Sequence, residues 1–168
     1  MDRNNKTRKM VITAMLAALT CVATMIIKIP SPLKGYINLG DCVVLAAGWL
    51  LPPGYGFFAA GVGSALADIL SGYIIYAPAT LIIKGSMALV AHFVYKILCK
   101  NSKSMGPRVI SGVLAEMTMV AGYFLFEGIL YGFGPSIINI PANAVQGTAG
   151  LILGCLLIKI FDRTDIGF

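Results

Sequence analysis

The stretch from Gly61 to Val90, GVGSALADILSGYIIYAPATLIIKGSMALV, is apolar enough to enter a lipid bilayer, yet it contains the charged residues Asp68 and Lys84. A charge near the centre of a membrane costs about 2.5 to 3.5 kcal/mol or more, so such residues usually face the interior of a bundle. Gly72 and Pro78 interrupt the helical pattern between the two charges. The stretch therefore predicts two membrane helices joined by a short break, with both charges turned inward.

Asp68 and Lys84 are expected to reach a similar depth in the membrane. Asp68 precedes the predicted break by about one helical turn, and Lys84 follows it by about two turns. Because either charge alone would lack a partner, we predict that the two are energetically coupled as a buried ion pair. The alternative that either or both point into a ligand cavity stays open, because pairing alone does not explain why the chain keeps them.

The composition indicates an integral membrane protein. Hydrophobic residues make up 58% of the 168 residues and charged residues only 12%, whereas soluble domains carry about 25% charged residues. The net charge of +6 does not indicate nucleic acid, because the basic residues gather between apolar runs, where they report orientation. The four cysteines show no CxxC spacing and there is one histidine, so no metal site or cofactor is expected.

Apolar runs separated by proline, glycine and polar residues predict one all-α domain over residues 1–168, an integral membrane bundle of six transmembrane helices. The predicted spans are about 10–27, 39–51, 55–71, 78–98, 109–130 and 136–161. Asn38 is expected to cap the second helix, with Asp41 in its first turn. Ten of the 13 Lys and Arg residues lie on the side shared by the termini, against Lys28 and Lys34 opposite. Both termini are therefore expected in the cytoplasm.

Polar side chains recur at helical spacing on three of the predicted helices. They are Tyr76, Thr80 and Lys84; Glu116, Tyr123 and Glu127; and Asn139, Asn143 and Gln146. Apart from Glu116 and Gln146, they lie toward the outer ends of their spans, so we expect a cavity that opens outward and is closed inward. The alternative is hydrogen bonding between helices without a ligand, worth about 0.6 kcal/mol per bond.

No catalytic pattern is present in the sequence. The chain contains no GxxxxGK[ST] nucleotide loop, no GxGxxG, no HExxH and no Ser/His/Asp set. The two halves also lack the paired broken helices of a secondary transporter. We therefore predict a protein that is not an enzyme and that relies on other subunits for energy if it moves a solute.

Small residues at four-residue spacing indicate places where membrane helices approach closely. The sets are Ala14 and Ala18; Ala59, Gly63 and Ala67; and Gly150 and Gly154. For the last two sets, helix packing within the chain is a sufficient explanation.

Taken together, the segments AMLAALT, GYINLGD, GSALADILSGY, YAPATLIIKG and PANAVQG resemble the substrate-binding S components of energy-coupling factor (ECF) transporters. The likeness covers nearly the whole chain and is closest to the branch for riboflavin and for pyridoxine or hydroxymethylpyrimidine. It implies a bacterial plasma membrane subunit that binds one vitamin from outside. A membrane scaffold subunit and two cytoplasmic ATPase subunits would then supply transport. It also implies that Ala14 and Ala18 dock on the scaffold, and that Ile29 to Asn38 form a lid with Tyr36 as its aromatic residue.

The expected substrate site combines this lid with the polar helix faces. Its predicted residues are Tyr36, Asp68, Tyr76, Thr80, Lys84, Tyr123, Glu127, Asn139, Asn143 and Gln146. Because Lys84 could meet an anionic oxygen, a pyridoxine-like or related pyridine or pyrimidine compound is expected first and riboflavin second. The leading alternative is a membrane scaffold or assembly protein without a ligand, and a small channel is the third possibility. Charges within the spans favour the substrate site.

Overall fold

The computed structural model describes residues 3–31, 35–99 and 104–163, and the side chains of residues 3, 4 and 163 are not described. Lys34, Lys100 and Lys103, which entered the orientation argument, and residues 32–34 of the predicted lid lie outside the described residues.

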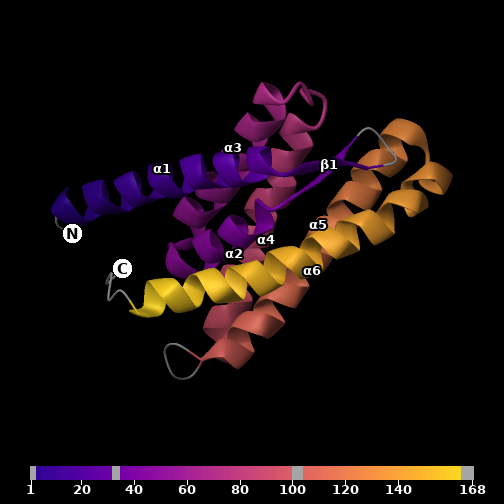
Figure 1. Cartoon of the computed structure of the whole chain (residues 1–168). Helices are drawn as coiled ribbons and strands as arrows, with labels where there is room; N and C mark the ends of the chain where they lie inside the picture. Colours follow the sequence, from indigo (N-terminus) through magenta and orange to yellow (C-terminus); the bar gives the residue numbers. More distant parts are fainter. Residues whose placement is uncertain (1–2, 32–34, 100–103, 164–168) are drawn as a thin grey trace.

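Six helices make up most of the described chain, as predicted (Figure 1). They are α1 (Arg3–Ile26), α2 (Asp41–Leu50), α3 (Pro53–Leu70), α4 (Ala77–Leu98), α5 (Met105–Tyr131) and α6 (Phe133–Arg163). Two short strands that the sequence reading did not predict, β1 (Lys28–Pro30) and β2 (Tyr36–Asn38), pair antiparallel between α1 and α2. The predicted lid region is therefore a small hairpin.

Four helices are long and apolar enough to cross a membrane: residues 5–26, 77–98, 105–131 and 133–162. The prediction of six helices is confirmed, but α2 has only ten residues. At about 1.5 Å per residue it is about 15 Å long, half the thickness of a bilayer core of about 30 Å. Of the six predicted transmembrane helices, α2 and α3 are therefore not among the four that are long and apolar enough to cross a membrane.

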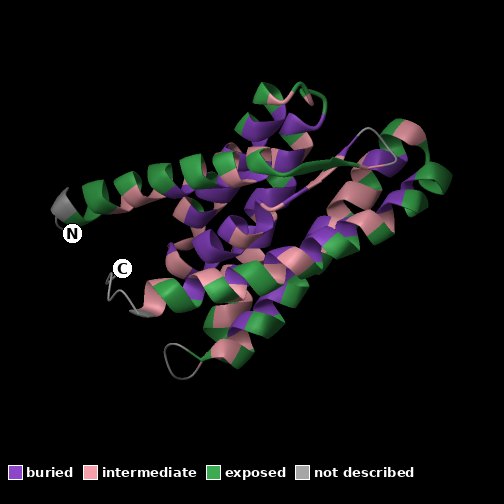
Figure 2. Ribbon diagram, viewed as in Figure 1, coloured by how far each residue is buried: buried purple, intermediate pink, exposed green. Residues whose placement is uncertain are grey.

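Helix α2 lies at the centre of the bundle, where it packs against α3, α4 and α6. Figure 2 shows it almost wholly buried, and Val44, Leu45 and Ala46 have no exposed surface. Gly48 permits a close approach to α4, because a Cβ at this position would lie 2.7 Å from the Ala88 carbonyl oxygen. A short helix surrounded by other helices needs apolar residues on every face, which explains its continuous hydrophobic sequence.

Asn38 does not cap α2 as predicted. The N-cap is Gly40, without a side-chain cap bond, and Asn38 belongs to β2. Its Oδ1 instead accepts a hydrogen bond from the Gly40 N–H at 2.9 Å. Strand pairing with Lys28 holds Asn38 two residues before the cap, and Asp41 still stands in the first turn.

The small-residue sets other than Ala14 and Ala18 lie where helices touch. Ala59 and Ala67 are fully buried in α3, and a Cβ on Gly63 would collide with the backbone of α1 at Ala17. A Cβ on Gly150 of α6 would lie 2.6 Å from the Asp41 Cβ of α2. These contacts agree with the packing interpretation.

The two ends of the chain lie on the same side of the molecule, and the β hairpin lies on the other side, near the turn between α5 and α6 (Figure 1). The hairpin therefore stands at the end of the bundle opposite the termini.

Candidate substrate cavity

A polar cavity of about 30 Å³ lies between the β hairpin and helices α3 to α6. Nine of the ten predicted site residues line it, and Lys84 is the exception. The full lining is Ser31, Gly35, Tyr36, Asn38, Asp68, Tyr73, Tyr76, Thr80, Tyr123, Glu127, Asn139, Asn143 and Gln146. The lid and the polar faces of three helices therefore meet at one place, as the sequence indicated.

The hairpin is attached to the turn between α3 and α4. The Tyr36 hydroxyl donates a hydrogen bond to Asp68 Oδ1 at 2.6 Å, and its ring lies 4.7 Å from the Tyr73 ring. Burial, and next the charge of Asp68, raise the pKa of the Tyr36 phenol, so it keeps its proton and remains a donor. Lys28 Nζ donates to Ser71 Oγ at 2.9 Å. These contacts cover the cavity from the side opposite the termini.

The opposite wall is organised around Glu127 of α5. Its Oε1 accepts hydrogen bonds from Asn139 Nδ2 at 2.7 Å and from the Tyr76 hydroxyl at 3.5 Å. The hydroxyls of Thr80 and Tyr123 form a further bond at 3.1 Å. Glu127 and Asn139 are each 2% exposed. The helical spacings predicted from the sequence thus bring Tyr76, Glu127 and Asn139 into one hydrogen-bonded layer.

Lys84 forms its ion pair with Asp41, at the start of α2, and not with Asp68. The predicted Asp68–Lys84 ion pair is therefore wrong. Lys84 and Asp41 are 2% and 0% exposed, and the central position of α2 places an acid closer to Lys84 than the neighbouring helix does. The sequence reading missed Asp41 because it treated that residue only as a helix-start signal. The sequence did carry a sign of this role, because Asp41 is the acidic first residue of an otherwise apolar helix.

Gln146 connects the cavity to this ion pair. Its Nε2 donates to Asp41 Oδ2 at 2.7 Å, and its Oε1 accepts from the Asn38 N–H at 3.0 Å. A single amide thereby joins strand β2 of the hairpin to the buried Asp41–Lys84 pair. The floor of the cavity and the lid share one hydrogen-bond network.

Glu116, the remaining acid on the polar face of α5, lies outside the cavity. Its side chain packs on Gly147 of α6 and lines an apolar groove between α5 and α6. Among the described residues neither of its carboxyl oxygens has a hydrogen-bond partner. Glu116 is therefore a buried acid outside the cavity lining, and it lies close to Asp41 beside Gly150 of α6.

The ECF-type riboflavin transporter S component family model matches residues 4–163. The chain belongs to this family. Members are membrane-embedded transport subunits, which confirms the resemblance drawn from the sequence and the prediction that the protein is not an enzyme.

Two relatives of this S component cover most of its length. The thiamine precursor transporter HmpT of Lactococcus lactis subsp. cremoris (strain MG1363) is 28% identical over 166 residues, which is 97% of this chain and 93% of HmpT. An uncharacterized protein from the gap 3′ region of Pyrococcus woesei is 37% identical over 134 residues, 79% of this chain and 87% of that protein.

Solved S components have the same fold. The S component of a bacterial ECF transporter superposes with a TM-score of 0.76 at 24% identity, covering 95% of this chain and 98% of the other. The S component for biotin from an ECF-type ABC transporter gives a TM-score of 0.71 at 20% identity, covering 98% and 94%. At these identities the likeness concerns the fold alone.

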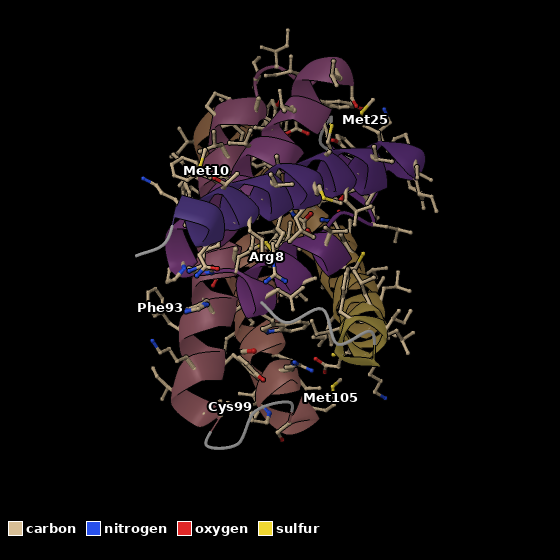
Figure 3. The ribbon with its side chains drawn as sticks, turned by 90° about the vertical axis from the view of Figure 1, so that its left-hand side faces the viewer. Arg8, Met10, Met25, Phe93, Cys99 and Met105 are labelled. Carbon is tan, nitrogen blue, oxygen red and sulfur yellow. The ribbon has the colours of Figure 1, made fainter. Side chains whose placement is uncertain are left out.

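On the outside of this S component, α1 carries an open apolar surface. Ala14 and Ala18 are exposed, and Ala18 borders an apolar groove of about 860 Å³ that runs along α1 to Leu50 and Phe161. Figure 3 shows α1 across the front of the molecule, with side chains including Met10 uncovered by any other helix. Ala14 and Ala18, which are predicted to dock on the scaffold subunit, are thus not buried by the other helices of this protein.

Proposed function

We propose that this protein is the substrate-capturing subunit of an ECF-type importer. It binds a water-soluble B-group vitamin from outside the cell and passes it to a membrane scaffold subunit energised by two cytoplasmic ATPases. Membership of the S component family supports this proposal.

The observation that carries the proposal is the convergence of polar side chains beneath the hairpin. Buried polar groups in a membrane protein are costly, and a small number of them around a cavity is typical of a ligand site. Asp68, Glu127, Asn139 and Gln146 come from three helices and are at most 4% exposed. A scaffold protein without a ligand would have no need to gather them at one place.

The lid has to move for a vitamin to enter. The cavity measures about 30 Å³, enough for one or two water molecules, whereas ligand pockets usually measure about 300 to 1,000 Å³. The contacts of Tyr36 with Asp68 and Tyr73 close this space. Opening requires those contacts to break and the hairpin to swing away from the turn between α3 and α4.

The proposed topology keeps six helical segments in the plasma membrane with both termini in the cytoplasm. The hairpin then faces outward, where it can admit substrate, and α2 reaches only part of the way across. Lys28 is the described basic residue on the hairpin side, whereas Arg8, Lys9, Lys96 and Lys159 lie toward the termini. This asymmetry is that of a positive cytoplasmic face.

The proposed ligand contains a small pyridine or pyrimidine ring, with riboflavin second. HmpT, a thiamine precursor transporter, is similar over nearly the whole chain, which favours the pyrimidine. The argument from Lys84 no longer favours pyridoxine, since Asp41 engages that ammonium group. The ring would lie between Tyr36 and the polar layer of Glu127 and Asn139.

Isothermal titration calorimetry of the purified protein tests this function. The panel contains hydroxymethylpyrimidine, pyridoxine, pyridoxal, riboflavin, thiamin, pantothenate, niacin, biotin and folate, and binding of one of them without ATP is expected. Native mass spectrometry would detect a vitamin that co-purifies. If a folded preparation binds no member of the panel, the vitamin-capturing function is wrong.

A further inference from the structure

A basic recess of about 400 Å³ lies between the start of α1, the link from α2 to α3 and the last turns of α4. It shares no lining residue with the cavity beneath the hairpin. Arg8 and Lys9 of α1 and His92 and Lys96 of α4 line it, together with Trp49 of α2. Figure 3 shows Arg8 just below the ribbon of α1. Side chains from helices far apart in the sequence therefore bring positive charge to one place.

The recess contains no acid that would balance this charge. No Asp or Glu is present among the described residues that line it, and neither Lys9 nor Lys96 belongs to an ion pair of the described residues. Basic residues are expected at the cytoplasmic end of a membrane protein, but that rule does not explain why they surround one recess. Like charges repel one another, so an anion bound between them would stabilise the arrangement.

The recess adjoins the apolar groove along α1. Arg8, Ile12 and Leu50 line both, and Arg8 is the one charged residue among the described residues of the groove. The groove follows α1 from Thr7 to Val22, about 22 Å at 1.5 Å per residue. One leaflet of the hydrocarbon core is about 15 Å thick. A basic recess beside an apolar groove of this length matches the two ends of a phospholipid.

We propose that the recess and the groove bind an anionic phospholipid. Its phosphate lies among Arg8, Lys9 and Lys96, and one of its acyl chains lies along α1. Basic pockets between membrane helices on the cytoplasmic side bind such headgroups, and the proposed orientation places the recess in that leaflet. A lipid accounts for both the charge and the apolar groove, whereas a soluble anion accounts for the charge alone. Because Ala18 also borders the groove, the acyl chain has to leave before the proposed scaffold contact forms.

The fluorescence of Trp49 provides a direct test. It is the only tryptophan of the chain and lines the recess, and its Nε1–H donates to Ser111 Oγ at 2.9 Å, which fixes the ring. The purified protein is placed in phosphatidylcholine nanodiscs that contain a brominated lipid, either phosphatidylglycerol or phosphatidylcholine at the same mole fraction. The bromines are near the headgroup end of the acyl chains. Phosphatidylglycerol should quench with an apparent affinity about fivefold higher or more, the contribution of one basic residue to anionic lipid binding.

Variants locate the headgroup. The double variant Lys9→Gln/Lys96→Gln should lose most of the preference for phosphatidylglycerol. Lys159→Gln is the matched control, because Lys159 is an exposed lysine near the end of α6 that lines neither the recess nor the groove, and it should keep the preference. Soluble glycerol phosphate, which has the charge but no acyl chain, should not relieve the quenching.

Equal quenching by the two brominated lipids would overturn the inference. An equal loss of preference in Lys159→Gln would also overturn it, because general surface attraction would then explain the effect. Relief of quenching by glycerol phosphate would show a site for soluble anions and reject the lipid. None of these outcomes affects vitamin capture, which uses the cavity beneath the hairpin.

Discussion

At the scale of single residues, the Asp41–Lys84 pair is the contact on which the buried polar network depends. Lys84 contacts Asp41 Oδ1, and Gln146 occupies Asp41 Oδ2. The pair thus neutralises a charge inside the bundle and also positions the amide that holds strand β2. Removing either partner leaves the other charge buried and alone.

Lys84→Met and Asp41→Asn should each lower the stability of the protein by about 3 to 5 kcal/mol, because each leaves an unpaired charge in the core. The double variant should be milder than either single variant. The measurement is the midpoint of thermal unfolding in detergent, with the exposed Lys28→Met as control. Strictly additive losses would show that the two residues do not stabilise one another.

At the scale of elements, α2 depends on close backbone approach, because it has to fit between α3, α4 and α6. Gly48 faces the Ala88 carbonyl and the Ala91 side chain of α4 without space for a methyl group. Helix α1, by contrast, presents Ala14 and Ala18 to the outside. Small residues therefore serve internal packing in one helix, and in the other they leave a surface on which a partner can lie closely.

Gly48→Ala should destabilise the bundle by about 1 to 3 kcal/mol, because an added methyl group forces α2 away from α4. Gly106→Ala is the matched control, since a Cβ there has no neighbour within 4 Å. Thermal unfolding of both variants provides the comparison. Equal midpoints would mean that α2 and α4 move apart without cost.

Ala14→Trp or Ala18→Trp should abolish uptake and leave substrate binding intact. A bulky side chain on the exposed face of α1 blocks a close helix contact with the scaffold but does not reach the cavity. Uptake in cells and calorimetry on the purified variants measure the two effects separately. Loss of binding in both variants would mean that the alanines support this protein's own fold.

At the scale of the whole molecule, the cavity under the hairpin and the exposed apolar face of α1, where we propose that the scaffold docks, lie on different parts of the bundle. This separation allows capture and energised transport to be divided between subunits. The proposed function requires the hairpin to face outward and the termini to face the cytoplasm. The orientation is thus as important to the function as the cavity itself.

Single cysteines in a background without the native cysteines test the orientation. Ile74→Cys, in the exposed turn between α3 and α4, should react with an impermeant reagent in intact cells. Ser104→Cys, at the start of α5, should react only after the membrane is opened. The reverse pattern would show that the hairpin faces the cytoplasm.

The sequence by itself determined the properties that depend on neighbouring residues along the chain. Apolar run length established the number of helices, and polar spacing placed Tyr76 and Thr80 on one face and Asn139, Asn143 and Gln146 on another. Seven of the nine predicted residues that line the cavity came from this spacing, whereas Tyr36 came from the family resemblance and Asp68 from its charge within an apolar run. The family followed from motifs of the same local kind.

Only the tertiary structure decided which helix supplies the partner of each buried charge. Lys84 could have met Asp68 or Asp41, and the choice depends on α2 lying at the centre of the bundle, which its sequence does not encode locally. The strand pairing that places Asn38 in β2 has the same origin. Helix rotation and depth are set by contacts between residues far apart in the chain, such as Gly48 with Ala88 and Gln146 with Asp41.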